Sequence, residues 1–199
     1  MCHPQDSRAF QNPFLDNYKD INIDKLHQDS KVRQRQLLDQ VLKHGIESSK
    51  KDPSFYTGLA GIALMLDKVG YKDQALKLIE KSKNVPIRKS RITFLCGLSG
   101  PLAISAKLNQ SQRDLKSLLD LSKYLSDPDL PNELLYGRVG YLYALLYVKD
   151  TFPNEEKAIE ENIKLTVDLI IQEGIKGSRV WRSRSPLMFS WHDKAYFGS

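Results

Sequence analysis

The sequence predicts an all-α protein made of repeated α-hairpins, and three observations support this. Pairs of glycines separated by two residues occur three times, and their first members, Gly58, Gly97 and Gly137, lie 39 and 40 residues apart. An almost wholly apolar segment follows each pair, and an amphipathic segment follows each apolar one. Because a helix that is apolar all round belongs in an interior, each hairpin needs neighbours to cover it.

Two architectures fit such hairpins, an open α-solenoid and a closed, double-layered α/α barrel. One helix of each pair is far more apolar than its partner and begins at glycines, which favours inner helices converging on a ring. Three hairpins cannot close a ring, so we expect an incomplete α/α-hairpin toroid, roughly half of the full circle. The chain is then the N-terminal part of one domain, with an arm over residues 1–28 and hairpins over 29–199.

The elements before and within the first hairpin follow from apolar spacing and breakers. Residues 29–48 carry apolar side chains at helical spacing, which predicts an amphipathic surface helix, and Asp52-Pro53 lies beyond its end. The first apolar helix starts at Gly58 and stops at Gly70, and its amphipathic partner covers 71–82.

The second and third hairpins follow the same order. An apolar helix from Gly97 ends at Asn109, and its partner covers 111–125. The third apolar helix lies within 132–147 and its partner within 154–172, after which Gly174 and Gly177 predict a long basic loop. Each glycine in a helix costs about 1 kcal/mol relative to alanine, so close approach of another backbone or a ligand must offset that cost.

Composition limits the classes of function. With 41% hydrophobic and 27% charged residues the chain has the composition of a soluble globular protein, and its net charge of +6 is spread along the sequence. One short basic stretch around Trp181 is weak support for nucleic-acid binding, so we expect no nucleic-acid partner. Only Cys2 and Cys96 are present, which favours a reducing compartment, and we expect a cytoplasmic protein with the plasma-membrane surface as the alternative location.

Several motifs in order along the chain resemble the eukaryotic lanthionine synthetase C-like proteins. The similarity begins at Arg8-Ala9-Phe10 and Asn12-Pro13 and then follows the three glycine pairs. The matching runs at those pairs are Tyr56-Thr57-Gly58-Leu59-Ala60-Gly61-Ile62-Ala63, Ile92-Thr93-Phe94-Leu95-Cys96-Gly97 with Gly100-Pro101-Leu102-Ala103, and Asn132-Glu133-Leu134-Leu135-Tyr136-Gly137-Arg138. The similarity ends with Ser185-Pro186-Leu187-Met188 and Trp191-His192, and it therefore covers nearly the whole chain.

This resemblance implies an α/α barrel with a central zinc ion that binds glutathione and adds its thiol to dehydrated serine or threonine residues of a peptide or protein. Zinc would serve by lowering the pKa of the bound thiol. In the family the ligands are two Cys and one His in C-terminal motifs, and this sequence contains none of those motifs. We therefore expect a fragment or shortened isoform that coordinates no metal fully and is inactive alone. The alternatives are a non-catalytic glutathione-binding adaptor, an α-hairpin scaffold, or a six-hairpin carbohydrate-active relative.

Two residues are candidate site residues through the resemblance. Arg8 matches an arginine implicated in glutathione handling, where a guanidinium could pair with a carboxylate, although an exposed arm arginine explains it equally well. Glu133 corresponds to an acidic residue thought to assist catalysis in the bacterial cyclases, and a carboxylate there could accept a proton. An acidic residue near a helix N-terminus is the plainer explanation of Glu133.

Five other residues have plainer structural readings. Tyr56, Tyr136 and Arg138 border the glycine pairs, where they line the mouth of a barrel or pack between hairpins. Cys96 lies outside the zinc motifs, and we expect a small buried apolar side chain. His192 has no Cys or His companion at ligand spacing, so we expect a structural or surface histidine.

Overall fold

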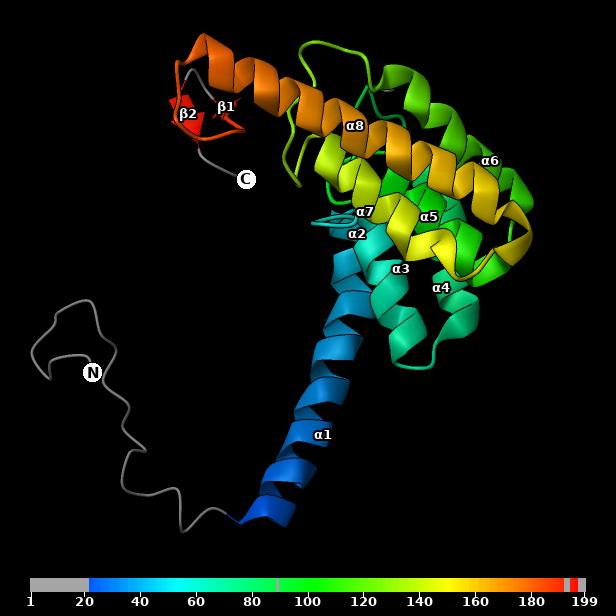
Figure 1. Ribbon diagram of the computed structural model, residues 1–199. Coiled ribbons are helices and arrows are strands. Elements are labelled where there is room, and N and C mark those ends of the chain that lie inside the picture. The colour runs from blue at the N-terminus through cyan, green and yellow to red at the C-terminus, as the bar shows by residue number, and fades with distance from the viewer. Residues whose placement is uncertain (1–21, 89, 192–193, 197–199) are drawn as a thin grey trace, which may run out of the picture. The chain divides into compact units, whose positions relative to one another are not determined.

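The computed structural model describes residues 22–88, 90–191 and 194–196 of the chain (Figure 1). The chain divides into two compact units, Met1–Lys43 and His44–Ser199. Arg8 and His192, both singled out from the sequence, lie outside the described residues. None of the helices within the described ranges is long and apolar enough to cross a membrane.

The described part of the first unit is dominated by helix α1 (Ile23–Gln40). It begins at Asn22, whose side-chain oxygen accepts a hydrogen bond from the backbone N–H of Lys25 at 2.9 Å. The sequence prediction started this helix at Asp29 and was wrong by six residues, because the capping signal at Asn22 was assigned to the arm. None of the residues of α1 is buried. The chain continues through a π-helical turn, η2 (Val41–Gly45), into α2 (Ile46–Ser48).

The second unit contains the three predicted hairpins. The first pairs α3 (Leu59–Lys68) with α4 (Lys72–Lys83). The second pairs α5 (Ser99–Asn109) with α6 (Gln112–Leu119), which runs on into the 3₁₀ helix η3 (Asp120–Tyr124). The third pairs α7 (Arg138–Lys149) with α8 (Glu156–Val180), preceded by the 3₁₀ turn η4 (Pro153–Glu155).

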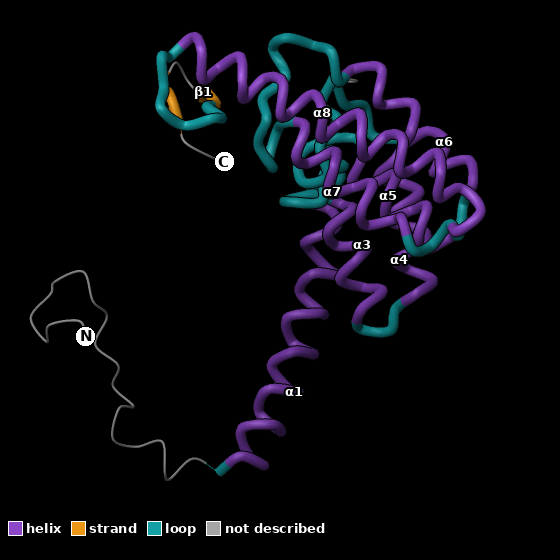
Figure 2. Tube along the Cα trace, in the orientation of Figure 1, coloured by secondary structure: helices purple, strands orange, loops and turns teal. Residues whose placement is uncertain are grey.

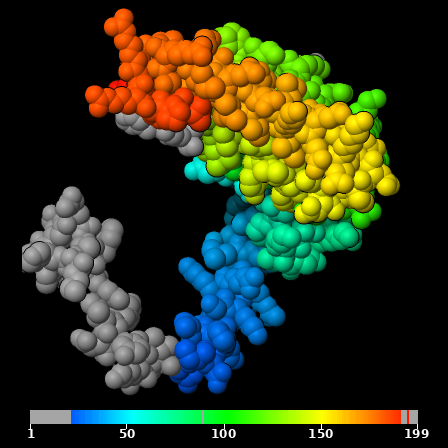
Figure 3. Space-filling view, viewed as in Figure 1, coloured from blue at the N-terminus to red at the C-terminus, as the bar shows by residue number. Residues whose placement is uncertain are grey.

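The hairpins stand side by side with their apolar helices in one row. Helix α5 packs against α3 on one side and α7 on the other, and each apolar helix packs against its own amphipathic partner (Figure 2). In Figure 3, α8 forms a continuous outer surface of this unit. The all-α hairpin fold is therefore confirmed, with α3, α5 and α7 as the inner layer.

Burial within the inner layer depends on how many neighbours each helix has. Most of α5, the middle helix, is buried, including Ile104 and Ala106 at 0% exposure. Helix α7 has Tyr141 and Leu145 buried at 0% but leaves Tyr143 at 48% and Leu146 at 52% exposed. Part of the apolar surface of α7 is thus uncovered within the described residues, as expected for a helix at the end of a row.

The C-terminal part of the unit differs from the prediction. Helix α8 does not stop before Gly174 but continues to Val180, so the first part of the predicted basic loop is helical. The two glycines are tolerated because another segment lies against them. A Cβ on Gly177 would come within 2.1 Å of the Met188 carbonyl oxygen, and the Met188 N–H donates to the Gly174 carbonyl at 2.9 Å. The antiparallel strands β1 (Phe189–Trp191) and β2 (Lys194–Tyr196) then form a short hairpin that was not predicted.

Candidate functional site

Three loops with nearly the same structure precede the inner helices, and we call them the glycine loops (residues 52–58, 91–97 and 131–137). Each ends at the first glycine of a pair. In each, the residue after that glycine donates its backbone N–H to the carbonyl oxygen seven residues earlier. These bonds run from Leu59 to Asp52 at 2.8 Å, from Leu98 to Arg91 at 2.7 Å and from Arg138 to Pro131 at 2.9 Å. The repeat seen in the sequence is therefore a repeat of backbone geometry.

The glycines are needed because each loop folds back on itself. A Cβ at Gly58, Gly97 or Gly137 would lie 2.2–2.3 Å from a backbone carbonyl oxygen of the same loop. The second member of each pair faces the same obstacle; at Gly100 the Cβ would lie 2.1 Å from the Phe94 carbonyl oxygen. The prediction that close backbone approach offsets the cost of these glycines is confirmed.

A polar side chain four residues before the first glycine holds each loop. Ser54, Thr93 and Glu133 occupy this position, and each accepts a hydrogen bond from the backbone N–H of the residue just before the glycine. Glu133 accepts from the N–H of Tyr136 with one oxygen and from the N–H of Leu135, at 2.6 Å, with the other. Both oxygens of the candidate catalytic carboxylate are thus engaged in holding its own loop.

Neighbouring glycine loops are hydrogen bonded to one another. The Tyr56 N–H donates to the Leu95 carbonyl at 2.9 Å, which joins the first loop to the second. The Thr93 hydroxyl donates to the Leu135 carbonyl at 2.7 Å, and this joins the second loop to the third. The three loops form one continuous layer over the starts of the inner helices.

A pocket of about 610 Å³ opens on this layer, and we call it the loop pocket. Its charged and reactive lining comprises three cationic side chains, one carboxylate, two phenols and one thiol. These residues are Lys51, Arg88, Arg91, Asp52, Tyr56, Tyr136 and Cys96. Tyr56 and Tyr136 are 65% and 47% exposed.

Cys96 does not behave as the buried apolar residue that was expected. Its thiol is only half-buried and lies at the loop pocket. Burial raises the pKa of the Cys96 thiol, the carboxylates of Asp52 and Glu133 raise it further, and the nearby Arg91 opposes them. The thiol therefore stays protonated near neutral pH, which makes it a poor nucleophile in this state.

Asp52, the acidic residue of the pocket lining, is engaged within its own loop. Its carboxylate accepts hydrogen bonds from the Thr57 hydroxyl at 2.7 Å and the Ser54 N–H at 2.9 Å. Burial alone would raise the pKa of Asp52, but these hydrogen bonds outweigh it and leave the pKa below its ordinary value. The carboxylate is an anion near neutral pH and stabilises the loop.

Arg138 is placed away from the pocket, unlike the two tyrosines. It is 3% exposed, and its guanidinium donates to the carbonyl oxygens of Leu125, at 2.8 Å, and Asp127, at 2.9 Å, and to the Asn132 side chain. It also donates to the Leu130 carbonyl. Arg138 therefore holds the segment between the second and third hairpins, and packing between hairpins is the reading that the structure supports.

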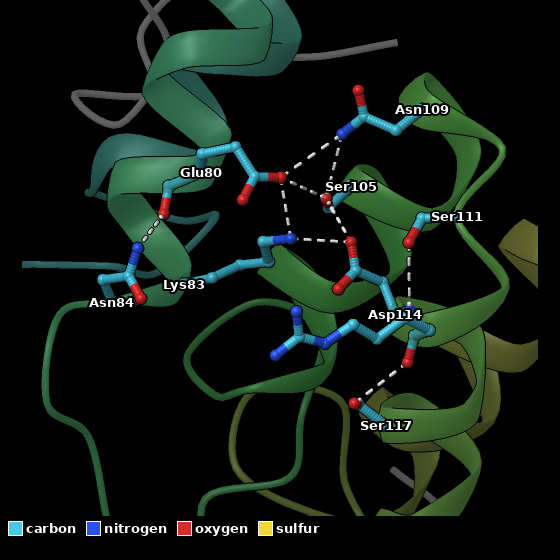
Figure 4. Close-up of polar contacts among 9 residues, drawn as sticks. Glu80, Lys83, Asn84, Ser105, Asn109, Ser111, Asp114 and Ser117 are labelled. Carbon is cyan, nitrogen blue, oxygen red and sulfur yellow. Dashed lines mark hydrogen bonds and ion pairs between the residues drawn. The ribbon is translucent and has the colours of Figure 1, made fainter.

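A second group of polar residues lies between the first and second hairpins, and we call it the polar cluster (Glu80, Lys83, Ser105, Asn109 and Asp114; Figure 4). Lys83 forms ion pairs with Asp114 at 2.6 Å and with Glu80 at 2.8 Å. The Ser105 hydroxyl donates to Asp114 at 2.7 Å. Every charge in the cluster has a partner, so it ties α4 to α5 and α6.

Zinc, which the family resemblance implies, does not fit the described residues. No three His, Cys, Asp or Glu side chains within residues 22–88, 90–191 and 194–196 come together as a metal site would require. The thiol of Cys96 at the loop pocket has a raised pKa. The two carboxylates whose charges act on it, Asp52 and Glu133, are committed to backbone and hydroxyl donors. The described residues therefore do not supply the set of free donors that a zinc site needs.

Comparison with known proteins gives concordant results. A family model described as "Lanthionine synthetase C-like protein" matches residues 49–199, the range that holds all three hairpins. The chain is 35% identical over 178 residues to a Danio rerio protein named "Glutathione S-transferase LANCL1", covering 80% of this chain and 44% of that protein. It is 27% identical over 193 residues to the Arabidopsis thaliana "LanC-like protein GCL1", covering 82% of this chain and 44% of that protein.

The chain thus spans less than half of the length of these two relatives. The matched residues include the glycine loops, which the structure shows to be the repeated backbone feature of the hairpins. A model match over more than half of the chain, together with the hairpin fold, identifies the family. The chain belongs to the lanthionine synthetase C-like protein family.

Proposed function

We propose that the chain forms the first three hairpins of a glutathione-using barrel, in which the thiol of glutathione is added to dehydrated serine or threonine residues of a peptide or protein. The observation that carries the proposal is the 35% identity, over 178 residues, with a relative named a glutathione S-transferase. The family-model match to residues 49–199, which contain all three hairpins, supports it. The exposed apolar side chains of α7 support a place for further hairpins beside it.

In this proposal the chain provides binding surface and scaffold. The layer of glycine loops covers the starts of the inner helices, where the loop pocket opens. The activation of the glutathione thiol is assigned to residues outside these hairpins, because neither the Cys96 thiol nor the described carboxylates offer a metal-binding set. Two roles stay predictions: Glu133 as a proton acceptor and Arg8 as a glutathione ligand.

The proposal is tested with a chimera of the Danio rerio relative. Residues 49–199 of this chain replace the matching part of the relative, and transfer of glutathione to a peptide containing dehydroalanine is measured by mass spectrometry. We expect the chimera to transfer glutathione and the 199-residue chain alone to show only the uncatalysed rate. The unmodified relative is the positive control.

A folded but inactive chimera would contradict the proposal and favour a non-catalytic scaffold. Folding is checked by a cooperative thermal transition and a helical circular dichroism spectrum. Binding of glutathione by the inactive chimera would then single out the adaptor alternative, and loss of both binding and transfer would single out the scaffold.

A further inference from the structure

Another pocket lies at the C-terminal end of α8, where this helix packs against β1, and we call it the end pocket (Figure 1). Its volume of about 390 Å³ is within the range of roughly 300–1,000 Å³ typical of ligand sites. Three segments supply apolar side chains to its lining: the entry to the third glycine loop, the last turn of α8, and the start of β1. These side chains include Leu130, Pro131, Val180, Trp181, Met188 and Phe189.

Two of these apolar side chains are open to solvent. Val180 is 70% exposed and Trp181 is 47% exposed, although both line the same concave site. An indole ring combines a large apolar face with one N–H donor, and exposed tryptophans beside a pocket are frequent anchors for a partner. The pair therefore offers apolar surface to a ligand that enters the end pocket.

Strand β1 has an unpaired edge beside this pocket. The sheet formed by the described residues contains β1 and β2 alone, so each strand is paired along one edge only. Phe189 and Ser190 of β1 line the end pocket, whereas none of its described lining residues belongs to β2. An open strand edge offers backbone N–H and C=O groups to an extended peptide, and a pocket beside it selects the side chain of that peptide.

The end of α8 carries positive charge that the protein does not neutralise. Residues 176–184 hold four cationic residues and no acidic one; they are Lys176, Arg179, Arg182 and Arg184. Lys176 pairs with Glu173 at 3.6 Å. The three arginine side chains have no ion pair or hydrogen bond with any other residue that the structure describes. Unpaired guanidinium groups beside a pocket favour a ligand that carries carboxylates.

The turn that carries two of these arginines is held in place by its own hydrogen bonds. Arg182 has a φ of +48°, which turns the chain sharply after α8. The Ser183 N–H donates to the Ser178 carbonyl at 2.9 Å, and the Ser178 hydroxyl donates to the Ser185 carbonyl. Arg182 and Arg184 therefore extend from a fixed backbone directly after Trp181, which lowers the entropy lost on binding.

The remaining charges distinguish between classes of acidic ligand. The carboxylates of Asp129 and Glu173 also line the end pocket. A nucleic acid or an anionic lipid surface presents negative charge continuously, and these carboxylates would repel it. A peptide can place its acidic residues on the arginines and its neutral backbone and one apolar side chain in the pocket.

We propose that the end pocket docks an extended acidic segment of the peptide or protein substrate. The backbone of that segment pairs with the open edge of β1, one apolar side chain enters the pocket beside Trp181, and flanking carboxylates meet Arg182 and Arg184. This proposal rests on the proposed function and adds the class of sequence that the substrate carries. Pro131 belongs both to the third glycine loop and to the lining of the end pocket, so a docked peptide lies next to the layer of glycine loops.

Binding is measured by fluorescence anisotropy of labelled peptides added to the 199-residue chain. The probe is a short peptide with a central leucine flanked by glutamates. Three matched peptides replace the glutamates with lysines, replace the leucine with serine, or carry N-methyl groups on the backbone amides. We expect the probe to bind with an affinity that falls as salt is raised, and each matched peptide to bind at least about tenfold more weakly.

Variants of the chain locate the site. Trp181→Ala should weaken binding of the probe about tenfold, because it removes the apolar wall of the pocket. Arg182→Gln and Arg184→Gln should each weaken it several-fold and reduce its dependence on salt. Arg35→Gln, on the exposed surface of α1, removes the same charge elsewhere and should leave the affinity unchanged. Thermal unfolding of each variant confirms that it is folded.

Four outcomes overturn the proposal. Equal binding of the glutamate and lysine peptides removes the role of charge, and equal binding of the N-methylated peptide removes the role of the strand edge. Equal affinity of Trp181→Ala and Arg35→Gln places the peptide elsewhere. Tighter binding of phosphatidylserine vesicles or of single-stranded RNA than of the probe makes the surface a membrane or nucleic-acid site. The chimera, given a dehydroalanine peptide without acidic residues, tests the proposed function separately from all four.

Discussion

The glycine loops and the polar cluster both join neighbouring hairpins, but they are built from different parts of the chain. In the glycine loops the backbone makes most of the contacts, and the same bonds recur three times at matching positions. In the polar cluster side chains make the contacts, and they connect only the first hairpin with the second. The glycine loops are therefore a repeated element of the fold, whereas the polar cluster occurs at one junction between hairpins.

The difference shows what each region tolerates. A backbone contact at 2.1–2.3 Å from a glycine Cβ position leaves no room for any side chain, so the residue type is fixed by geometry. The polar cluster asks only that buried charge be paired, which other residues of similar shape could also satisfy. We therefore expect substitutions in the glycine loops to cost more than substitutions in the polar cluster.

The largest effect is expected for Gly100→Ala. The new methyl group would lie 2.1 Å from the Phe94 carbonyl oxygen and 3.4 Å from the Phe55 side chain. Because Phe94 belongs to the second glycine loop, its backbone cannot move away without disturbing that loop. We expect a loss of more than about 3 kcal/mol of unfolding free energy, the upper range for overpacking, measured by urea denaturation.

Gly70→Ala is the matched control for this substitution. Gly70 has a φ of +90°, but a Cβ there would meet nothing within 4 Å. Its cost is then only the strain of a left-handed backbone, about 1 kcal/mol. If the two variants were equally stable, close approach would not be the reason for the glycine pairs.

The next effect concerns Asp114→Asn in the polar cluster. The side chains of Asp114 and Lys83 are only 10% and 15% exposed, so neutralising the carboxylate leaves a mostly buried ammonium without its closest partner. We expect a loss of about 2 kcal/mol, below the full value for a buried pair because Glu80 still pairs with Lys83. Asp168→Asn on the exposed side of α8 is the control, with no measurable change expected.

The Asp114 effect should depend on pH in a defined direction. Burial alone would raise the pKa of Asp114, but hydrogen bonds from Lys83 and Ser105 and the charge of Lys83 lower it below its ordinary value of 3.8. A lowered folded-state pKa contributes stability above pH 3.8 that is lost as pH falls through the folded-state value. The stability difference between wild type and Asp114→Asn should be constant near neutrality and shrink below pH 3.8. A constant difference down to acid pH would contradict the assignment.

The contrast between the glycine loops and the polar cluster also explains how much of the structure could be predicted from the sequence. The three hairpins and the glycine loops were visible in the sequence because a repeated backbone geometry demands glycine at regular spacing, at Gly58, Gly97 and Gly137. The polar cluster was invisible, because Lys83 and Asp114 come from different hairpins and carry no local pattern. Nothing in their spacing distinguishes them from solvated charges on an amphipathic helix.

Two errors have the same physical origin. Gly174 and Gly177 were interpreted as helix breakers, yet α8 passes through them because the segment around Met188 packs against the bare backbone. Cys96 was expected to be buried, but it lies at a pocket that is lined also by residues 51–54, 56–57, 86–88 and 91, which come together with it only in the folded chain. Long-range contacts decided both cases, and a single sequence does not contain them.

The smallest effect is expected at Glu133, and it separates a loop-holding role from a catalytic one. Ser54 caps the first glycine loop at the position that Glu133 occupies in the third. Glu133→Ser should therefore keep one loop contact and cost less than about 1 kcal/mol. In the chimera, a loop-holding Glu133 predicts unchanged glutathione transfer for Glu133→Ser, whereas a proton-accepting Glu133 predicts a loss of roughly 10²-fold or more. Because both readings allow a stable protein, the transfer rate at equal stability decides between them, and the two engaged carboxylate oxygens lead us to expect the unchanged rate.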